Sequence, residues 1–288
     1  MPLRSRRGVP PTERSEPGGS KTGRRMNAEI VFLGSGTSMG VPTLGCGCAV
    51  CTSTDPRNRR TRPSIAVEWG DAGQRHTVVI DTGPDFREQA LREGIRKVDA
   101  VLYTHAHADH ILGMDDLRPL SFHHKPGFLP LYADEATGAI LRRIFDYTFS
   151  AGSAYPLRAR VELRSLDDTQ TAEIEGARFR RVPVLHGDMP VAGFRFGRAA
   201  YLTDMSSIPE TSLALLEGLD VLIVDALRAQ PHPTHANLEE ALQWVKRVRP
   251  KRAWFTHMSH EVDHAATEAA FPAHVRLSYD GLRIPFEL

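Results

Sequence analysis

The segment "AVLYTHAHADHILGMDDL" constrains the fold of this chain more than any other. It predicts a strand that ends at Thr104, a turn, and a helix that starts near Asp109. The turn carries four side chains of metal-ligating types, which are His105, His107, Asp109 and His110. Side chains alternate along an extended chain, so the first two histidines share one side, while the aspartate and the last histidine face a second point. We therefore expect this one turn to supply ligands to two metal ions.

The rest of the chain after Met26 alternates short apolar segments with amphipathic ones. Several predicted strands, such as "VLIV" and "VVI", are continuous apolar runs, as is typical of strands that are covered on both faces. A capping box of Asn237 and Glu240 predicts the start of one late helix. The fold class that we predict is α/β, a four-layer αβ/βα sandwich. The predicted strands are Glu29–Leu33, Ser64–Trp69, Thr77–Asp81, Ala100–Thr104, Leu129–Ala133, Phe179–Val184, Val191–Phe196, Ala200–Thr203, Val221–Val224, Ala253–Thr256 and Val275–Tyr279. The predicted helices are Asp85–Glu93, Asp109–His123, Glu135–Tyr147, Ser212–Glu217, Leu238–Val248 and Val262–Ala270.

Composition sets the outer limits of the interpretation. The chain has 288 residues, of which 41% are hydrophobic and 25% charged, which is enough to bury a full core. It lacks an apolar run long enough to cross a bilayer, and its N-terminus lacks the apolar segment of a secretory signal. We therefore expect a cytoplasmic protein that does not bind a membrane.

The first 25 residues differ from the rest. They hold seven Lys and Arg against two Glu, so the net charge of +1 divides into +5 in this segment and −4 in residues 26–288. We predict a disordered basic tail at 1–25 and one folded domain at 26–288. One interpretation is that translation starts at Met26 and that the tail is an over-long gene assignment; a nucleic-acid-binding arm is the alternative.

Three cysteines, Cys46, Cys48 and Cys51, lie within six residues. A disulfide with one spare thiol is one explanation, but Cys46 and Cys48 are too close to bridge without strain. A metal site is the other explanation, because closely spaced thiolates converge on a tetrahedral zinc. A closed zinc site needs a fourth ligand, and we look for it among the histidines.

The histidine turn resembles the histidine-aspartate motif of the metallo-β-lactamase superfamily. Other landmarks of that superfamily appear in their expected order, before and after this turn, and the match runs from about Met26 to the C-terminus. They are "VVIDTG" with Asp81, "VLHGD" with His186, "YLTDM" with Asp204 and "FTHMSH" with His257. The resemblance implies a dinuclear centre and a supporting role for Asp81. One metal is then held by His105, His107 and His186, and the other by Asp109, His110 and His257, with Asp204 bridging.

A finer resemblance is to the cyclic phosphodiesterase subfamily of the carbon–phosphorus lyase pathway, the PhnP-like proteins. That subfamily pairs a "CxCxxC" loop with the second histidine of "THxSH", which implies a structural zinc on Cys46, Cys48, Cys51 and His260. It also implies that His235 is the general acid, with His232 ranked second, beside catalytic roles for Asp109 and Asp204. The implied activity is metal-dependent hydrolysis of a small cyclic phosphodiester, similar to a phosphoribosyl cyclic phosphate, by two Zn or Mn ions. A histidine at position 107 favours a hydrolase over the redox-active di-iron branch, which typically has glutamate there.

Three other functions stay open. A tRNA 3′-processing nuclease would use the same ligands but needs a basic arm, and the acidic body of this chain offers none. A thioesterase or lactonase does not require the cysteine cluster, and a non-catalytic metal-binding module does not require His235. We expect a small phosphodiester as partner rather than nucleic acid, and a homodimer stays an open alternative. The remaining histidines are predicted to lie at the surface; they are His76, His123, His124, His264 and His274.

Overall fold

The computed structural model describes residues 26–71, 73–150, 152 and 155–288. The predicted tail at 1–25 lies outside these residues. In the described part of the chain, the first sheet has seven strands in the order β14-β1-β2-β3-β4-β5-β6. Their bounds are β1 Asn27–Gly34, β2 Ser64–Trp69, β3 His76–Ile80, β4 Ala100–Leu102, β5 Leu129–Ala133, β6 Val161–Ser165 and β14 Arg283–Glu287.

The second sheet also has seven strands within the described ranges, in the order β13-β12-β11-β10-β9-β8-β7. It consists of β7 Thr171–Ile174, β8 Ala177–His186, β9 Met189–Phe196, β10 Ala199–Leu202, β11 Val221–Asp225, β12 Arg252–Thr256 and β13 Val275–Leu277. Long antiparallel β8 and β9 lie beside the parallel strands β10 to β13. Both sheets are therefore mixed.

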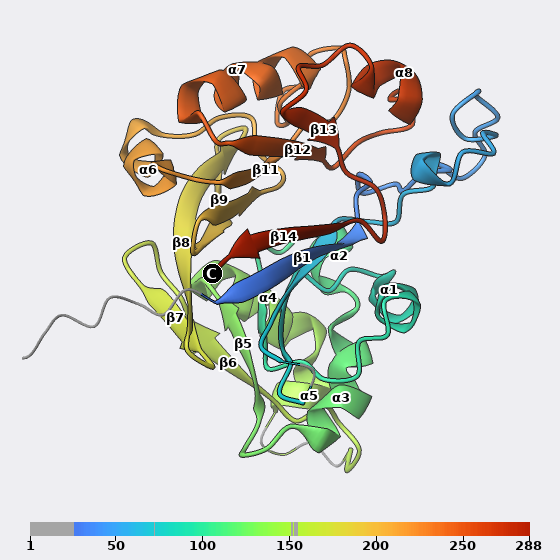
Figure 1. Ribbon diagram of the computed structural model, residues 1–288. Helices are drawn as coiled ribbons and strands as arrows, with labels where there is room; N and C mark the ends of the chain where they lie inside the picture. The colour runs from blue at the N-terminus through green and yellow to red at the C-terminus, as the bar shows by residue number, and fades with distance from the viewer. Residues whose placement is uncertain (1–25, 72, 151, 153–154) are drawn as a thin grey trace, which may run out of the picture.

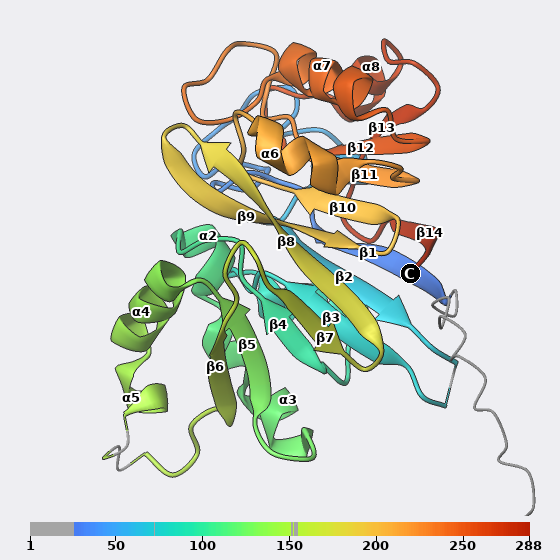
Figure 2. The same cartoon turned by 90° about the vertical axis from the view of Figure 1, so that its left-hand side faces the viewer.

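Helices cover the outer face of each sheet (Figures 1 and 2). The helices α1 to α5 lie over the first sheet, and α6 to α8 lie over the second. Their bounds are α1 Phe86–Arg92, α2 Ala108–Ile111, α3 Arg118–His123, α4 Glu135–Ile144, α5 Asp146–Phe149, α6 Glu210–Leu213, α7 Leu238–Val248 and α8 His264–Glu268. Short 3-10 turns occur at Pro56–Asn58, Met114–Leu117 and Ala214–Leu216.

Three apolar clusters account for the layers. One fills the space between the two sheets, with fully buried residues such as Phe32, Val67 and Phe194. The other two join each sheet to its helices, through residues such as Phe86 in one case and Phe255 in the other. The predicted four-layer α/β sandwich is therefore confirmed, because both faces of each sheet are covered and the strands need no polar side.

Some predicted elements differ from the observed ones. The predicted helix Asp109–His123 is broken into α2, a 3-10 turn and α3, because the N–H of Gly113 leaves the helical pattern and donates to the carbonyl of Thr82 (2.8 Å). The late helix predicted from Val262 begins instead at His264, because Asp263 caps it by accepting a bond from the N–H of Ala266. Strands β6, β7 and β14 were not predicted. The capping box at the head of α7 is confirmed.

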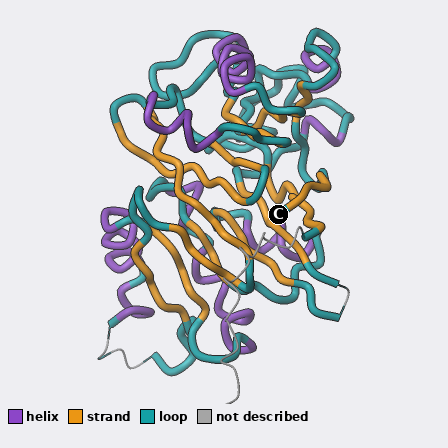
Figure 3. The backbone as a smooth tube through the Cα atoms, turned by 60° about the vertical axis from the view of Figure 1, so that its left-hand side comes forward, coloured by secondary structure: helices purple, strands orange, loops and turns teal. Residues whose placement is uncertain are grey.

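The order of the strands places several strand ends at one edge of the molecule. Strands β3, β4 and β5 run parallel to one another, and so do β10, β11 and β12. The carboxyl ends of parallel strands meet at one edge of a sheet. Figure 3 shows the two groups of strands in orange, with teal loops joining their ends to the purple helices. The predicted ligands follow β4, β10 and β12 or end β8, so they belong to this edge.

Candidate metal centre and active site

The ligand-type side chains of the turn after β4 lie in two kinds of environment. His105, Asp109 and His110 are buried, whereas His107 is exposed. Asp109 and His110 belong to α2, so their side chains project from helical backbone, whereas His107 precedes the helix in extended backbone and His105 lies two residues earlier. Burial thus separates His107 from the other three side chains and does not divide the turn into the two pairs that the alternation predicted, although the rings of His105 and His107 stay neighbours.

Asp204 lies at the centre of the predicted ligands. Its Oδ2 lies 3.2 Å from Nε2 of His110, and its Oδ1 lies 3.2 Å from Nε2 of His257 and 4.0 Å from Nε2 of His105. The ligand-type atoms of Asp109, His110, Asp204 and His257 all lie within 4.8 Å of one another. One carboxylate therefore faces histidines on both sides, as a bridging ligand must.

A second group forms around the other side of Asp204. The ligand-type atoms of His186, Asp204 and His235 lie within 4.8 Å of one another. The ring of His107 lies 5.3 Å from the ring of His186 and 4.5 Å from that of His105, centroid to centroid. The structure thus brings together all seven predicted ligands of the dinuclear centre, and it adds His235 beside them.

The donor atoms in this cluster fit divalent cations. Among the buried atoms without a hydrogen-bond partner in the described residues are four that face this cluster, namely Nε2 of His105, His110 and His257 and Oδ2 of Asp109. Buried polar atoms are ordinarily paired, so four unpaired atoms that converge on one space indicate missing partners. Imidazole and carboxylate are common ligands of zinc and manganese.

The electric field in the cluster also favours cations. Burial acts to lower the pKa of His257, but the carboxylates of Asp204 and Asp109 outweigh it and raise the pKa to about 10. Burial also acts to lower the pKa of His110. The same two carboxylates, together with Asp81, outweigh this effect and raise the pKa of His110 well above its usual value. A buried space that holds protons this firmly is negative in potential, and a divalent cation would neutralise it.

Hydrogen bonds from outside the cluster orient the rings. The carboxylate of Asp81 lies 2.8 Å from Nδ1 of His110 and accepts bonds from the N–H and hydroxyl of Thr104. The carbonyl of Thr234 lies 2.8 Å from Nδ1 of His186. Because an acceptor faces Nδ1 in both cases, Nδ1 carries the proton and Nε2 keeps its lone pair for a metal. Asp81 thus has the supporting position that the sequence predicted.

The backbone is strained at three points of the site. Asp81, Asp204 and His257 have φ values of 67°, 51° and 62°. They are three of the five non-glycine residues with positive φ in the described ranges. Such conformations cost free energy and persist where the surrounding contacts hold them, which is typical of functional sites.

Sequence reasoning missed Asp225, the last residue of β11. It is fully buried, its Oδ2 lies 2.7 Å from Nδ1 of His235, and the same oxygen accepts a bond from the N–H of Met205 (2.8 Å). Its Oδ1 lies 3.8 Å from Nδ1 of His257. A buried carboxylate in this position accepts a hydrogen bond from Nδ1 of His235 and so fixes the orientation of the ring. The one signal in the sequence was an aspartate at the end of a continuous apolar strand.

The cysteine loop and its histidine come together at a second place. The sulfurs of Cys46 and Cys48 lie 3.3 and 3.5 Å from Nδ1 of His260, and Cys51 completes a group within 4.8 Å. Two ligands on one tetrahedral zinc would be about 3.5 Å apart, given Zn–S and Zn–N lengths of about 2.3 and 2.0 Å. The backbone N–H of Cys51 and the ring of His260 lower the pKa of Cys48 to about 6, which favours the thiolate that binds metal.

A buried arginine ties this loop to the active site. The guanidinium of Arg60 donates to the carbonyls of Ser259 (3.1 Å) and Val262 (2.8 Å). Its side chain is fully buried, which is unusual for arginine. Ser259 lies between His257 and His260, so the loop and the predicted dinuclear centre share one short segment.

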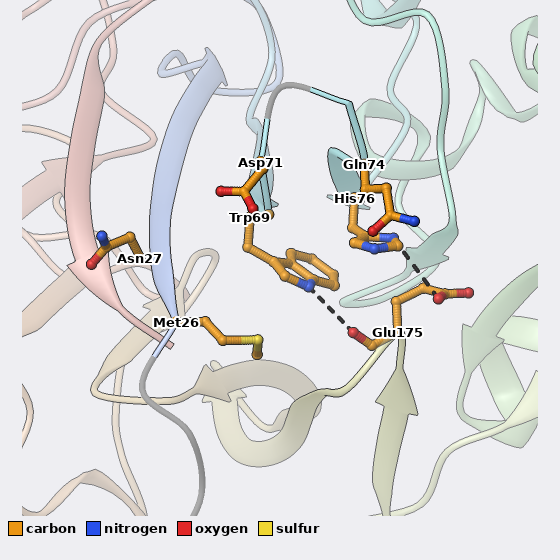
Figure 4. A pocket seen from close by; sticks show the side chains of 8 residues that line it. Met26, Asn27, Trp69, Asp71, Gln74, His76 and Glu175 are labelled. Carbon is orange, nitrogen blue, oxygen red and sulfur yellow. Dashed lines mark hydrogen bonds and ion pairs between the residues drawn. The ribbon is translucent and has the colours of Figure 1, made fainter.

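Three of the histidines that were predicted to lie at the surface are not exposed. His264, the first residue of α8, is buried, and His124 is half-buried. His76 is also half-buried and stacks on Trp69 with ring centroids 5.5 Å apart. Figure 4 shows His76 with Glu175 in a pocket of about 420 Å³. The pocket lies at the start of β3, whereas the predicted ligands lie beyond the strand ends. Ligand-type atoms of His76, Glu175 and nearby Asp99 lie within 4.8 Å of one another, but Asp99 already accepts a bond from the N–H of Thr77 and pairs with Lys97.

Comparison with known proteins decides the family. The model of the beta-lactamase superfamily domain matches residues 76–258, which is well over half of the chain and includes the histidine turn, His186, Asp204 and His257. This chain belongs to the beta-lactamase superfamily. Its two-sheet sandwich is the metallo-β-lactamase fold of that superfamily.

Three relatives of this superfamily member are informative. A solved structure described as a new diphosphatase from the PhnP family is 50% identical, with a TM-score of 0.84, over 92% of this chain and 99% of that one. An octanoyltransferase of Porphyromonas gingivalis is 35% identical over 254 residues, 88% of this chain and 50% of that protein. The ribonuclease Z of Bradyrhizobium diazoefficiens is 31% identical over 187 residues, 61% of this chain and 60% of that protein. The chain thus spans only half of the octanoyltransferase. In the described residues, no helix has the length and apolarity that a membrane span requires.

Proposed function

We propose that this chain is a phosphoric diester hydrolase with a dinuclear metal centre that acts on a small molecule. The observation that carries the proposal is the position of His235. Its ring lies beside the ligand-type atoms of His186 and Asp204, and its Nδ1 is held by the buried carboxylate of Asp225. A simple binding module would need no such residue next to a complete ligand set.

The proposed ligands are His105, His107 and His186 on one side, Asp109, His110 and His257 on the other, and Asp204 between them. Two divalent cations, Zn or Mn, would supply Lewis acidity toward phosphoryl oxygens and lower the pKa of water. The residues of the chain position the substrate against these cations. Cys46, Cys48, Cys51 and His260 are proposed to hold a structural Zn.

His235 is the proposed general acid. Hydrolysis of a phosphodiester breaks one P–O bond, and the departing oxygen must take up a proton. With Asp225 on Nδ1, the protonated ring presents the N–H of Nε2 toward the cluster, so it donates a proton to that oxygen and returns to the neutral form. Asp109 and Asp204 contribute by holding the cluster in place.

The first substrate class is a small cyclic phosphodiester, as the sequence resemblance implied. A second candidate is a diphosphate, and the relative that favours it is the 50% identical diphosphatase of the PhnP family. Both substrates place a phosphorus between two ester or anhydride oxygens, and both need a proton on the departing oxygen. The two are told apart by direct assay.

The test of this proposal should also include two other activities, those of a transfer-RNA nuclease and of an octanoyl thioesterase. The acidic body of residues 26–288 argues against a transfer-RNA nuclease, although a ribonuclease Z is among the relatives. The similarity to an octanoyltransferase makes an octanoyl thioester worth including as a substrate. We further propose that residues 26–288 form the hydrolase domain, that it acts in the cytoplasm, and that its partner is a small molecule rather than nucleic acid.

The test uses purified protein loaded with Zn or with Mn. Substrates are a ribose cyclic phosphate, a 2′,3′-cyclic nucleotide, a nucleoside diphosphate ester, bis(p-nitrophenyl) phosphate, an octanoyl thioester, a lactone and a precursor transfer RNA. We expect the phosphorus-containing small molecules to be turned over. Preference for the thioester or the RNA would contradict the proposal.

A matching variant tests the bridging carboxylate. Asp204→Ala removes both oxygens that face the histidines, so metal occupancy and turnover should fall together for every substrate. Metal content is measured by atomic emission. Full occupancy with normal turnover in this variant would show that Asp204 does not bridge.

A further inference from the structure

The loop between β11 and α7 carries a second histidine next to the proposed acid. His232 is half-buried, and its ring lies 5.1 Å from the ring of His235, centroid to centroid. It is not part of the ligand cluster. Its neighbourhood therefore raises the question of what a second imidazole does beside the acid.

The hydrogen bonds of His232 determine which nitrogen carries its proton. The backbone N–H of Thr234 donates to Nδ1 of His232 (3.3 Å). A backbone nitrogen cannot accept, so Nδ1 must present its lone pair, and the ring proton lies on Nε2. Burial, followed by the charges of His235 and Arg228, lowers the pKa of His232, which keeps this neutral form. Nε2–H is then a donor without a partner among the described residues.

The loop holds this donor in a fixed place. The three nitrogens of the Arg228 guanidinium donate to the carbonyl of Gln230 (3.3 Å), the carbonyl of Pro231 (3.2 Å) and the carboxylate of Glu261 (3.2 Å). On the other side of the loop, Nδ1–H of His186 donates to the carbonyl of Thr234 (2.8 Å). The loop is therefore bound on one side to Glu261, in the segment after β12, and on the other side to the proposed metal ligand His186.

We propose that His232 is a specificity-determining residue whose Nε2–H donates to an oxygen on the departing group, next to the oxygen that His235 protonates. The inference rests on the proposed function and narrows its substrate class. A fixed N–H donor pairs only with an acceptor, so the preferred substrate carries a phosphoryl or hydroxyl oxygen close to the scissile bond. A ribose cyclic phosphate and a diphosphate both meet this requirement.

The experiment compares substrates with and without that oxygen. In bis(p-nitrophenyl) phosphate the departing nitrophenolate has no oxygen beside the scissile one, whereas a ribose cyclic phosphate has hydroxyls there. Steady-state kcat and KM are measured for both, and for a nucleoside diphosphate ester, in the metal-loaded enzyme, His232→Leu and His232→Gln. The control is His274→Leu, an exposed histidine next to the start of β12, at the end of that strand remote from His257.

We expect His232→Leu to lower the preference for the ribose cyclic phosphate over bis(p-nitrophenyl) phosphate, as a ratio of kcat/KM, by about 10- to 100-fold, as for a hydrogen bond whose loss leaves an oxygen unpaired. His232→Gln should recover part of this preference, since its amide N–H can replace Nε2–H. Metal content and thermal stability should match those of the control. A larger effect on the diphosphate ester than on the cyclic phosphate would identify a phosphoryl oxygen as the acceptor, and the reverse would identify a hydroxyl.

Other outcomes overturn the inference. An unchanged ratio in an enzyme that turns over the phosphodiesters would show that His232 makes no such contact, while leaving the proposed function standing. An equal loss on all substrates, or a loss of metal, would assign His232 a structural or ligand role. An unmutated enzyme that hydrolyses none of the phosphorus compounds would overturn the proposed function itself and this inference with it.

Discussion

At the scale of single residues, the partner of Nδ1 decides what each imidazole of the site can do. Nδ1 of His110 faces Asp81 and Nδ1 of His186 faces a carbonyl, so each Nε2 keeps a lone pair for a cation. Nδ1 of His235 faces the buried carboxylate of Asp225, which orients the ring for the proposed role as acid. Nδ1 of His232 accepts from an N–H, which makes its Nε2 a donor. One side-chain type thus has three chemical capacities, each set by a neighbour.

The role of His235 as acid predicts a dependence on the leaving group. His235→Ala should leave metal content intact and slow the hydrolysis of substrates with alkoxide leaving groups by roughly 10²–10⁴-fold, the usual range for a general acid. A nitrophenolate needs little protonation, so the loss for bis(p-nitrophenyl) phosphate should be much smaller. Rates and metal content of the purified variant check this. Equal losses on both substrates, or loss of metal, would make His235 a ligand or a positioning residue.

Buried His264 predicts a dependence of stability on pH. Burial, followed by the positive charge of Arg57, lowers the pKa of His264 to about 4, and Arg60 adds to this while Glu268 and Asp55 oppose it. The ring of Tyr279 also packs against it. The unfolded chain, with a histidine pKa of about 6.5, binds more protons than the folded one between these values. The contribution is therefore complete above about pH 6.5 and is lost as pH falls toward about 4.

Urea unfolding at several pH values measures this effect. Relative to His264→Gln, the unmutated protein should lose up to about 1 kcal/mol of unfolding free energy for each pH unit between about 6.5 and 4. Below that window the difference should level off. Parallel curves for the two proteins across the window would show that His264 does not titrate in this way.

At the scale of elements, the long loop between β1 and β2 is held at several points. The cysteines and His260 gather at its middle, and near the start of β2 Arg60 is bound to the carbonyls of Ser259 and Val262. Gly36, just after β1, also pairs with Met258 in an isolated bridge. The segment that follows β12 therefore carries the proposed ligand His257 and also makes the contacts that hold the cysteine loop. If the loop loses its ordered structure, these contacts are lost and the position of His257 in the active site should change.

The cysteine cluster predicts one metal ion besides the dinuclear pair. Cys48→Ser removes a thiolate from a closed site, so the protein should lose one zinc equivalent and unfold at a lower temperature. Leu44→Ser, at a position 95% exposed in the same loop, is the matched control. Zinc content and melting temperature check both variants. An unchanged zinc content in Cys48→Ser would mean that these four residues do not hold zinc.

At the scale of the whole molecule, each sheet contributes part of the proposed site. The histidine turn follows β4 of the first sheet, whereas His186, Asp204 and His257 come from β8, β10 and β12 of the second. The apolar layer between the sheets fixes how these two edges meet. The site is therefore assembled only when the whole sandwich has formed, and a change in that layer should affect metal binding from a distance.

The basic segment 1–25 predicts a result at this scale. Its composition cannot bury apolar surface, so a chain that starts at Met26 should fold with the same melting temperature and hydrolyse the same substrates at the same rate as the full chain. Circular dichroism and steady-state kinetics on both chains check this. Loss of folding or of activity in the shorter chain would show that the tail contributes to the enzyme.

The sequence by itself determined what depends on local spacing. The strand, turn and helix around His105 to His110, the capping box of α7 and the close set of cysteines all follow from residues within a few positions of one another. Backbone geometry over so short a range leaves few alternatives, so the sandwich fold and the candidate ligand types were readable without coordinates. The order of the motifs along the chain added the remaining candidates by resemblance.

The tertiary structure alone decided which distant residues meet. Asp225 is ten residues from His235, and Arg60 is about 200 residues from Ser259, so neither contact leaves a periodic trace in the sequence. The burial of His264 and the edge positions of β6, β7 and β14 depend likewise on packing between elements. The physical reason is that such contacts arise when the order of the strands brings distant segments of the chain together, and strand order is a property of the folded core.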